Sequence, residues 1–78
     1  MPTSQDITKA IAEHLGLSSE DLDRDALLKE DLGLGPIELN DLLSDISKKF
    51  NISFDPVEIE TLNKIEDLIV IVEDNLID

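Results

Sequence analysis

The side chains of this chain that could carry chemistry are one histidine, six serines and a large excess of carboxylates, with no cysteine. The lack of cysteine excludes a thiolate metal site and a thiol nucleophile. His14 has no second histidine with which to complete a zinc site. A serine-histidine-acid triad needs a cleft, and a helical chain of 8.7 kDa leaves little room for one. We therefore predict no catalytic residue and no enzyme.

Asp21, Asp23 and Asp25 have the one-three-five spacing of a calcium-binding loop. Continuing the same count places Ala26 where such a loop needs a glycine turn, and Leu32 where it needs a bidentate glutamate. The pattern therefore predicts no metal site.

The charge of the chain limits its partners. Nineteen acids against six bases give a net charge of −13, which repels nucleic acid and attracts proteins with basic surfaces. No segment is apolar for the ~18 residues of a membrane span, and the first residues lack a secretion signal. A chain of 78 residues is long enough for one core. We expect one domain over residues 1–78, monomeric, cytoplasmic and not bound to membranes.

The elements that would position these side chains are helices. A helix over 4–15, with Thr3 as its cap and Gly16 at its end, is predicted by an apolar stripe at three- and four-residue spacing, namely Ile7, Ala10, Ile11 and Leu15. A long connection with a short helical turn follows, and its leucines pin it to the core. Pro36 suits the first position of a helix over about 36–50. Asp55 and Pro56 begin a short third helix, and the Asn63–Glu66 segment caps a fourth over about 64–76. The apolar stripe of this fourth helix is Ile65, Leu68, Ile69, Val72 and Leu76. This pattern predicts an all-α four-helix bundle.

The second predicted helix has two faces. A stripe roughly 100° wide faces the core and contains Leu39, Leu42, Leu43, Ile46 and Phe50. Ile37 falls nearly opposite this stripe, among Glu38, Asp41 and Asp45. An apolar anchor ringed by carboxylates predicts a docking patch for a basic partner surface, although a solvated face would show the same pattern.

Several segments together resemble the acyl carrier proteins of fatty-acid, polyketide and nonribosomal peptide synthesis. The resemblance covers nearly the whole chain and needs no gap. It is carried by Asp31-Leu32-Gly33, the apolar Ile37, the acids Glu38 and Asp41, Phe50-Asn51-Ile52 and Ile65-Glu66-Asp67-Leu68. It implies the four-helix carrier fold and partners such as synthase enzymes or a phosphopantetheinyl transferase.

The resemblance breaks where the family carries its cofactor. Family members esterify 4'-phosphopantetheine to a serine that begins the second helix, after an aspartate. Here Gly35 occupies the aspartate position and Pro36 the serine position, while Asn40 replaces a usually apolar residue. Proline has no hydroxyl, and Leu34, Gly35 and Ile37 offer no other side-chain heteroatom. We therefore predict no cofactor attached in the usual way, and a packed core rather than a cavity for an acyl chain.

The sequence thus favours an acyl-carrier-like domain with a docking or regulatory role in biosynthesis. A first alternative is a working carrier modified at an unusual serine, of which Ser44 on the acidic face is the least unsuitable. A second alternative is a structural helical module outside biosynthesis.

Overall fold

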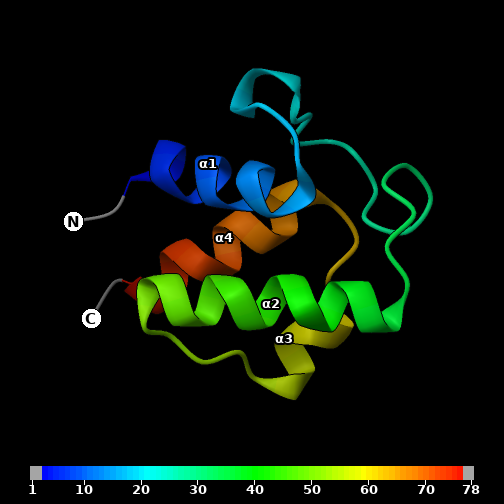
Figure 1. The fold of residues 1–78 in the computed structure, drawn as a ribbon. Coiled ribbons are helices and arrows are strands. Elements are labelled where there is room, and N and C mark those ends of the chain that lie inside the picture. The colour runs from blue at the N-terminus through cyan, green and yellow to red at the C-terminus, as the bar shows by residue number, and fades with distance from the viewer. Residues whose placement is uncertain (1–2, 77–78) are drawn as a thin grey trace.

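The fold is a bundle of helices, seen in a computed structural model that describes residues 3–76. Within these residues lie four α-helices and one 3₁₀ turn, and no strand beyond an isolated bridge: α1 (Ser4–Leu15), η1 (Ser19–Asp21), α2 (Pro36–Phe50), α3 (Pro56–Glu60) and α4 (Ile65–Leu76). α1 and α2 run in opposite directions and pack against each other, α4 packs against α1, and α3 lies at the end of the molecule away from α1 (Figure 1). The predicted all-α four-helix bundle, with a long first connection and a short third helix, is confirmed.

Local capping fixes the ends of α1. The Thr3 backbone N–H donates to the Asp6 carboxylate at 2.8 Å, and the Asp6 N–H donates to the Thr3 hydroxyl oxygen at 3.2 Å. This reciprocal pair satisfies N–H groups that have no partner within the helix. Gly16 ends the helix in the left-handed region at φ 74°, which glycine adopts at little cost. The predicted bounds of 4–15 are confirmed.

The later helices begin at the predicted places, with one correction. Asp55 and Glu58 form the capping box of α3, as expected. The predicted cap of α4 was wrong by one residue, because the helix begins at Ile65 rather than Lys64. Asp67, rather than Glu66, reaches back and accepts hydrogen bonds from the backbone N–H groups of Asn63 and Lys64, both at 3.0 Å.

The core is aliphatic and comes from three helices. The eight largest side chains that are fully buried in the described part of the chain are Ile7, Ile11, Leu42, Ile46, Ile65, Leu68, Ile69 and Val72. All eight belong to the predicted apolar stripes. The predicted stripe members at the margins of the core are only partly buried, namely Leu15, Leu39, Phe50 and Leu76.

The long connection between α1 and α2 is fastened to the start of α4. The Leu28 N–H donates to the Asn63 carbonyl at 2.8 Å, and the Ile65 N–H donates to the Ala26 carbonyl at 3.1 Å, on either side of a bridge between Leu27 and Lys64. Buried side chains hold the same connection from inside, at Leu22, Leu28 and Leu34. The connection therefore sets where α2 begins relative to α4.

Candidate functional site

The start of α2 is the candidate site, and its geometry follows from Gly35 and Pro36. Pro36 takes the first helical position and Gly35 the N-cap, without a side-chain hydrogen bond at the cap. Gly35 has φ −80° and ψ 178°, an extended conformation open to any residue, so its backbone does not require glycine. The Gly35 carbonyl accepts the first helical hydrogen bond from the Leu39 N–H at 2.9 Å. The helix start is therefore well formed.

A carboxylate lies over this helix start. Glu38 folds back so that its Oε2 is 3.2 Å from the position that a Cβ atom would take on Gly35. The amino end of a helix carries partial positive charge and favours a nearby carboxylate. Glu38 thus provides negative charge at the end of α2 where Gly35 supplies no capping oxygen.

The two serines of α2 lie away from its start. Ser44 is exposed on α2 but follows Pro36 by eight residues, which is about 12 Å along the helix axis. The Ser47 hydroxyl donates to the Ile52 carbonyl at the other end of α2. The structure therefore places neither serine of α2 near the start of that helix.

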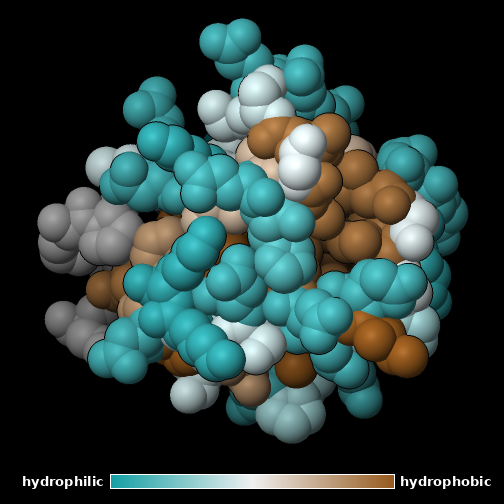
Figure 2. All heavy atoms as spheres, in the orientation of Figure 1, coloured by the Kyte–Doolittle hydropathy of each residue, from teal (hydrophilic) through white to brown (hydrophobic). Residues whose placement is uncertain are grey.

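A mainly apolar hollow of about 280 Å³ opens beside Pro36. Its apolar wall comes from the long connection, α2 and the turn after α3, through Leu28, Leu34, Leu39 and Leu62. Figure 2 shows apolar atoms gathered on the side of the molecule where the long connection lies, next to a hydrophilic face formed by α1 and α2. The sequence pattern predicts a packed core and gives no sign of this hollow, because the walls of the hollow come from separate segments.

The predicted docking residues divide into two groups. Ile37 is 75% exposed, and Glu38 and Asp41 are exposed beside it in the first turns of α2. Glu38 and Asp41 also line a shallow hollow between α2 and the end of α1. These three residues form a continuous acidic surface around an apolar side chain.

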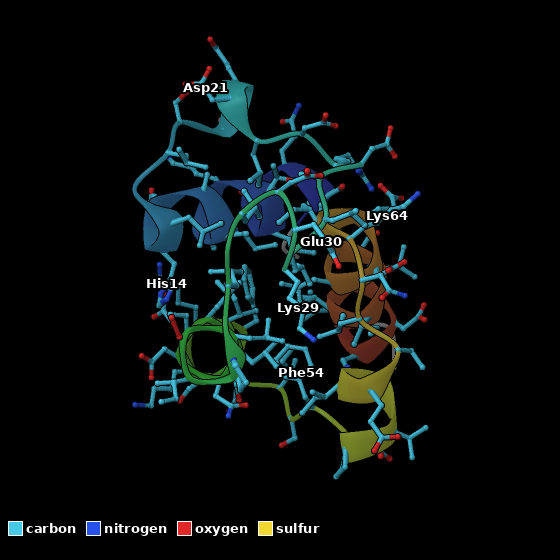
Figure 3. All side chains as sticks on the ribbon, turned by 90° about the vertical axis from the view of Figure 1, so that its right-hand side faces the viewer. His14, Asp21, Lys29, Glu30, Phe54 and Lys64 are labelled. Carbon is cyan, nitrogen blue, oxygen red and sulfur yellow. The ribbon has the colours of Figure 1, made fainter. Side chains whose placement is uncertain are left out.

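Asp45 forms the second group, because its carboxylate contacts other side chains and is less exposed. Its Oδ2 lies 3.0 Å from His14 Nδ1 and 3.7 Å from Lys49 Nζ, and its side chain is only 33% exposed. His14 reaches from the end of α1 toward α2 (Figure 3). Asp45 therefore links two helices, which the sequence analysis missed because His14 and Asp45 are 31 residues apart.

Two of the three aspartates with calcium-like spacing accept local hydrogen bonds through their carboxylates. Asp21 accepts from the Ser18 hydroxyl at 2.9 Å, and Asp23 accepts from the Asp25 N–H at 2.9 Å. Among residues 3–76 no group of three or more histidine, cysteine or acidic side chains is arranged to hold a metal ion. No helix in the same range is long and apolar enough to cross a membrane.

Comparison with known proteins supports the resemblance seen in the sequence. Residues 5–70 match the family described as the phosphopantetheine attachment site. An acyl carrier protein from Exiguobacterium sibiricum is 32% identical over 68 residues, which cover 87% of this chain and 86% of that protein. One from Nitratidesulfovibrio vulgaris (strain Miyazaki F) is 29% identical over 73 residues, covering 94% and 96% of the two chains. One from Thermotoga maritima is 27% identical over 70 residues, covering 90% and 86%.

Proposed function

Since the chain belongs to the phosphopantetheine attachment site family and is an acyl-carrier-like domain, we propose that it serves biosynthesis as a docking or regulatory module that carries no arm in the usual way. The process would be fatty-acid, polyketide or nonribosomal peptide synthesis in the cytoplasm. In this proposal the domain is a monomer that binds partner enzymes and catalyses no reaction itself.

The observation that carries the proposal is the chemistry of the α2 start. Attachment of a phosphopantetheine arm needs a side-chain oxygen that attacks phosphorus, and the aligned family motif would place it at Pro36. Gly35, Pro36 and Ile37 have no side-chain heteroatom, and Ser44 lies about 12 Å along the axis. Glu38 does have side-chain oxygens near the helix start. Its carboxylate lies over Gly35, however, and not at the attachment position of the family motif. These features support a helix start that keeps its structure without the attachment chemistry.

Intact mass spectrometry after incubation with a phosphopantetheinyl transferase and coenzyme A tests the missing chemistry. We expect the unchanged protein to gain no mass. The double variant Gly35→Asp/Pro36→Ser restores the family residues, and we expect it to gain one phosphopantetheine because the helix start around them is preserved.

A gain of one arm by the unchanged protein would contradict this proposal. The variant Ser44→Ala then identifies the site, since loss of the gain in that variant would establish the alternative of a working carrier modified at Ser44. If neither the unchanged protein nor the double variant gains mass, the proposed recognition of this domain by the transferase is wrong.

The second part of the proposal assigns docking to Ile37, Glu38 and Asp41, with Asp45 at the edge of the surface. Exposed carboxylates around an apolar anchor favour a basic surface with an apolar recess, such as a patch on a synthase or a transferase. We expect Asp45 to contribute less, because its carboxylate already lies 3.0 Å from His14 Nδ1 and 3.7 Å from Lys49 Nζ.

Charge reversal tests this surface. We expect Glu38→Lys/Asp41→Lys to weaken binding to a carrier-recognising synthase about tenfold at low salt, and to reduce the salt dependence of binding. Glu20→Lys/Asp21→Lys is the matched control, because both residues are exposed on η1 and the change in net charge is the same. Equal weakening by the two pairs would show that net charge alone attracts the partner, and no binding to any carrier-dependent enzyme would favour a structural module outside biosynthesis.

A further inference from the structure

His14 is the single histidine of the chain, and it lies beside the proposed docking residues of α2. Its Nδ1 is 3.0 Å from Asp45 Oδ2, and its side chain is only 27% exposed. Figure 3 shows this side chain directed from the end of α1 toward α2. His14 also lines the shallow hollow that Glu38 and Asp41 line. It therefore contacts one of the proposed docking carboxylates and shares a hollow with the two others.

The elements that pack against α1 determine which charged groups act on His14. Lys49 of α2 has its Nζ 3.7 Å from Asp45 Oδ2 and 3.8 Å from Oε2 of Glu13, the neighbour of His14 on α1. The long connection contributes an apolar side chain to the hollow, and the buried residues of α4 are all apolar. η1 also packs on α1, but its Glu20 lines a separate hollow with the first half of that helix. The charged groups near His14 therefore come from α2 and from Glu13.

His14 is the member of this group whose charge can vary at neutral pH. Carboxylates and lysines ordinarily keep their charges there, whereas a histidine ordinarily changes its charge between about pH 5 and 8. A neutral imidazole leaves the negative charge of the docking carboxylates in place. A protonated imidazole puts a positive charge beside Asp45 and on the wall of the hollow with Glu38 and Asp41, where it repels the basic side chains of a partner.

We propose that docking of a basic partner at the acidic surface around Ile37 is coupled to the protonation of His14, and that the domain binds more tightly when His14 is neutral. This inference rests on the docking role proposed above and adds that the surface responds to pH. Because the coupling is reciprocal, a bound partner also favours release of the proton. His14 and Asp45 are both partly exposed, so solvent screens the effect, and we expect protonation to raise the Kd about threefold.

The test compares the Kd for a carrier-recognising synthase at about pH 5.5 and about pH 8, at constant low salt. His14→Asn keeps an uncharged nitrogen donor near the place of Nδ1 and removes the titration. Groups of the synthase that titrate act equally on both proteins. We therefore expect the ratio of the two Kd values to be about threefold larger for the unchanged domain than for His14→Asn. His14→Gln removes the titration with a different side-chain shape and should give the same ratio as His14→Asn.

His14→Arg tests the charge itself, because it carries a permanent positive charge. At about pH 8 we expect it to bind about threefold more weakly than His14→Asn. Glu20→Gln is the matched control, since it changes the net charge as protonation of His14 does, but on η1 and outside the docking surface. We expect it to keep the pH dependence of the unchanged domain. Amide spectra of the His14 variants that match the unchanged domain would show that the packing of α1 on α2 is kept.

Equal Kd ratios for the unchanged domain and His14→Asn would overturn the inference. Equal Kd values for His14→Arg and His14→Asn at about pH 8 would overturn it as well, as would a Glu20→Gln variant that loses the pH dependence. If Glu38→Lys/Asp41→Lys leaves binding unchanged, or if no synthase binds, the docking proposal fails and this inference fails with it. Weakening by that pair without any effect of His14 rejects the coupling alone, so the two failures are distinguishable.

Discussion

Glu38 shows how one side chain can complement a helix end whose N-cap residue supplies no side-chain oxygen. The N-cap residue Gly35 has no side chain, yet the Glu38 carboxylate lies over it at the positively polarised end of α2. An aspartate at position 35 would meet this carboxylate, and the flexible end of Glu38 would have to move away. Gly35 and Glu38 therefore form a matched pair at the start of α2.

Asp6 gives the clearest pH prediction for a single residue. The backbone N–H of Thr3 and then its hydroxyl donate hydrogen bonds to the Asp6 carboxylate, which lowers the pKa of Asp6 below 3.8. Because the folded-state pKa lies below the unfolded value, the stabilisation is present above pH 3.8 and is lost as the pH falls through the folded-state pKa. NMR titration of the side-chain carboxyl carbon measures this pKa directly.

Thr3→Ala separates the two hydrogen bonds. We expect it to raise the pKa of Asp6 only part of the way to 3.8, because the backbone N–H of residue 3 still donates. Asp6→Asn removes the titrating group, so its stability should depend less on pH in this acidic range. A pKa of Asp6 at or above 3.8 in the unchanged protein would contradict the capping geometry.

At the scale of the element, α2 separates its structural and surface roles by face. Ile46 is fully buried and Ile37 is 75% exposed, although both are isoleucines of the same helix. We expect Ile46→Ala to lower the free energy of unfolding by about 2–4 kcal/mol, through lost burial and a residual cavity. Ile37→Ala should change it by less than about 0.5 kcal/mol, because the side chain is already in water.

Urea unfolding of both variants with a common m value measures the difference. For a domain of this length the total stability is about 4–12 kcal/mol, so the Ile46 variant should lose a large part of it. A cost above about 1 kcal/mol for Ile37→Ala would show that this side chain has a structural role.

The elements themselves could be predicted because their boundaries depend on local residues. Gly16, Pro36 and the Asp55-Pro56 pair mark helix ends without help from distant parts of the chain, and the structure has these ends where the sequence predicts them. The cap of α4 could not be predicted in this way. Both Glu66 and Asp67 suit a first turn, and in the structure Glu66 instead accepts a hydrogen bond from Arg24, which lies 42 residues away.

The side-chain pairs between helices were also beyond prediction from local pattern. Arg24 Nη2 donates to Glu66 Oε1 at 3.0 Å, and hydrogen bonding with Glu66 raises the pKa of Arg24. The side chains of Asp45 in α2 and His14 in α1 are likewise in contact between two elements. Such pairs determine which acidic residues remain available to a partner. The sequence therefore identified the acidic face of α2, but not that Asp45 on this face already contacts another side chain.

At the scale of the whole molecule, the dominant electrostatic feature is repulsion among the carboxylates. The net charge is −13, and the ion pairs seen between side chains are largely exposed ones that contribute little each. The fold therefore depends on its aliphatic core, and its stability should respond to ionic strength.

We expect the free energy of unfolding to rise by about 1–2 kcal/mol when NaCl is raised from about 0.01 M to 0.5 M, because salt screens repulsion between carboxylates. Urea unfolding at each salt concentration measures this. The variant Glu20→Lys/Asp21→Lys changes the net charge by two units per substitution, from −13 to −9, and should show a smaller salt effect. A fall in stability with salt would mean that the ion pairs outweigh the repulsion.

The bridge between Leu27 and Lys64 affects how readily a protease cleaves the long connection. Trypsin cleaves after arginine and lysine, and Arg24 and Lys29 both lie in the long connection. The Arg24 carbonyl accepts from the Glu66 N–H at 2.8 Å, and the neighbouring Ala26 and Leu28 are bonded to the start of α4. A protease needs an extended, detached segment, so cutting after Arg24 requires this contact to open first. The rate of cleavage there therefore reports how often the connection separates from α4 rather than how exposed it is.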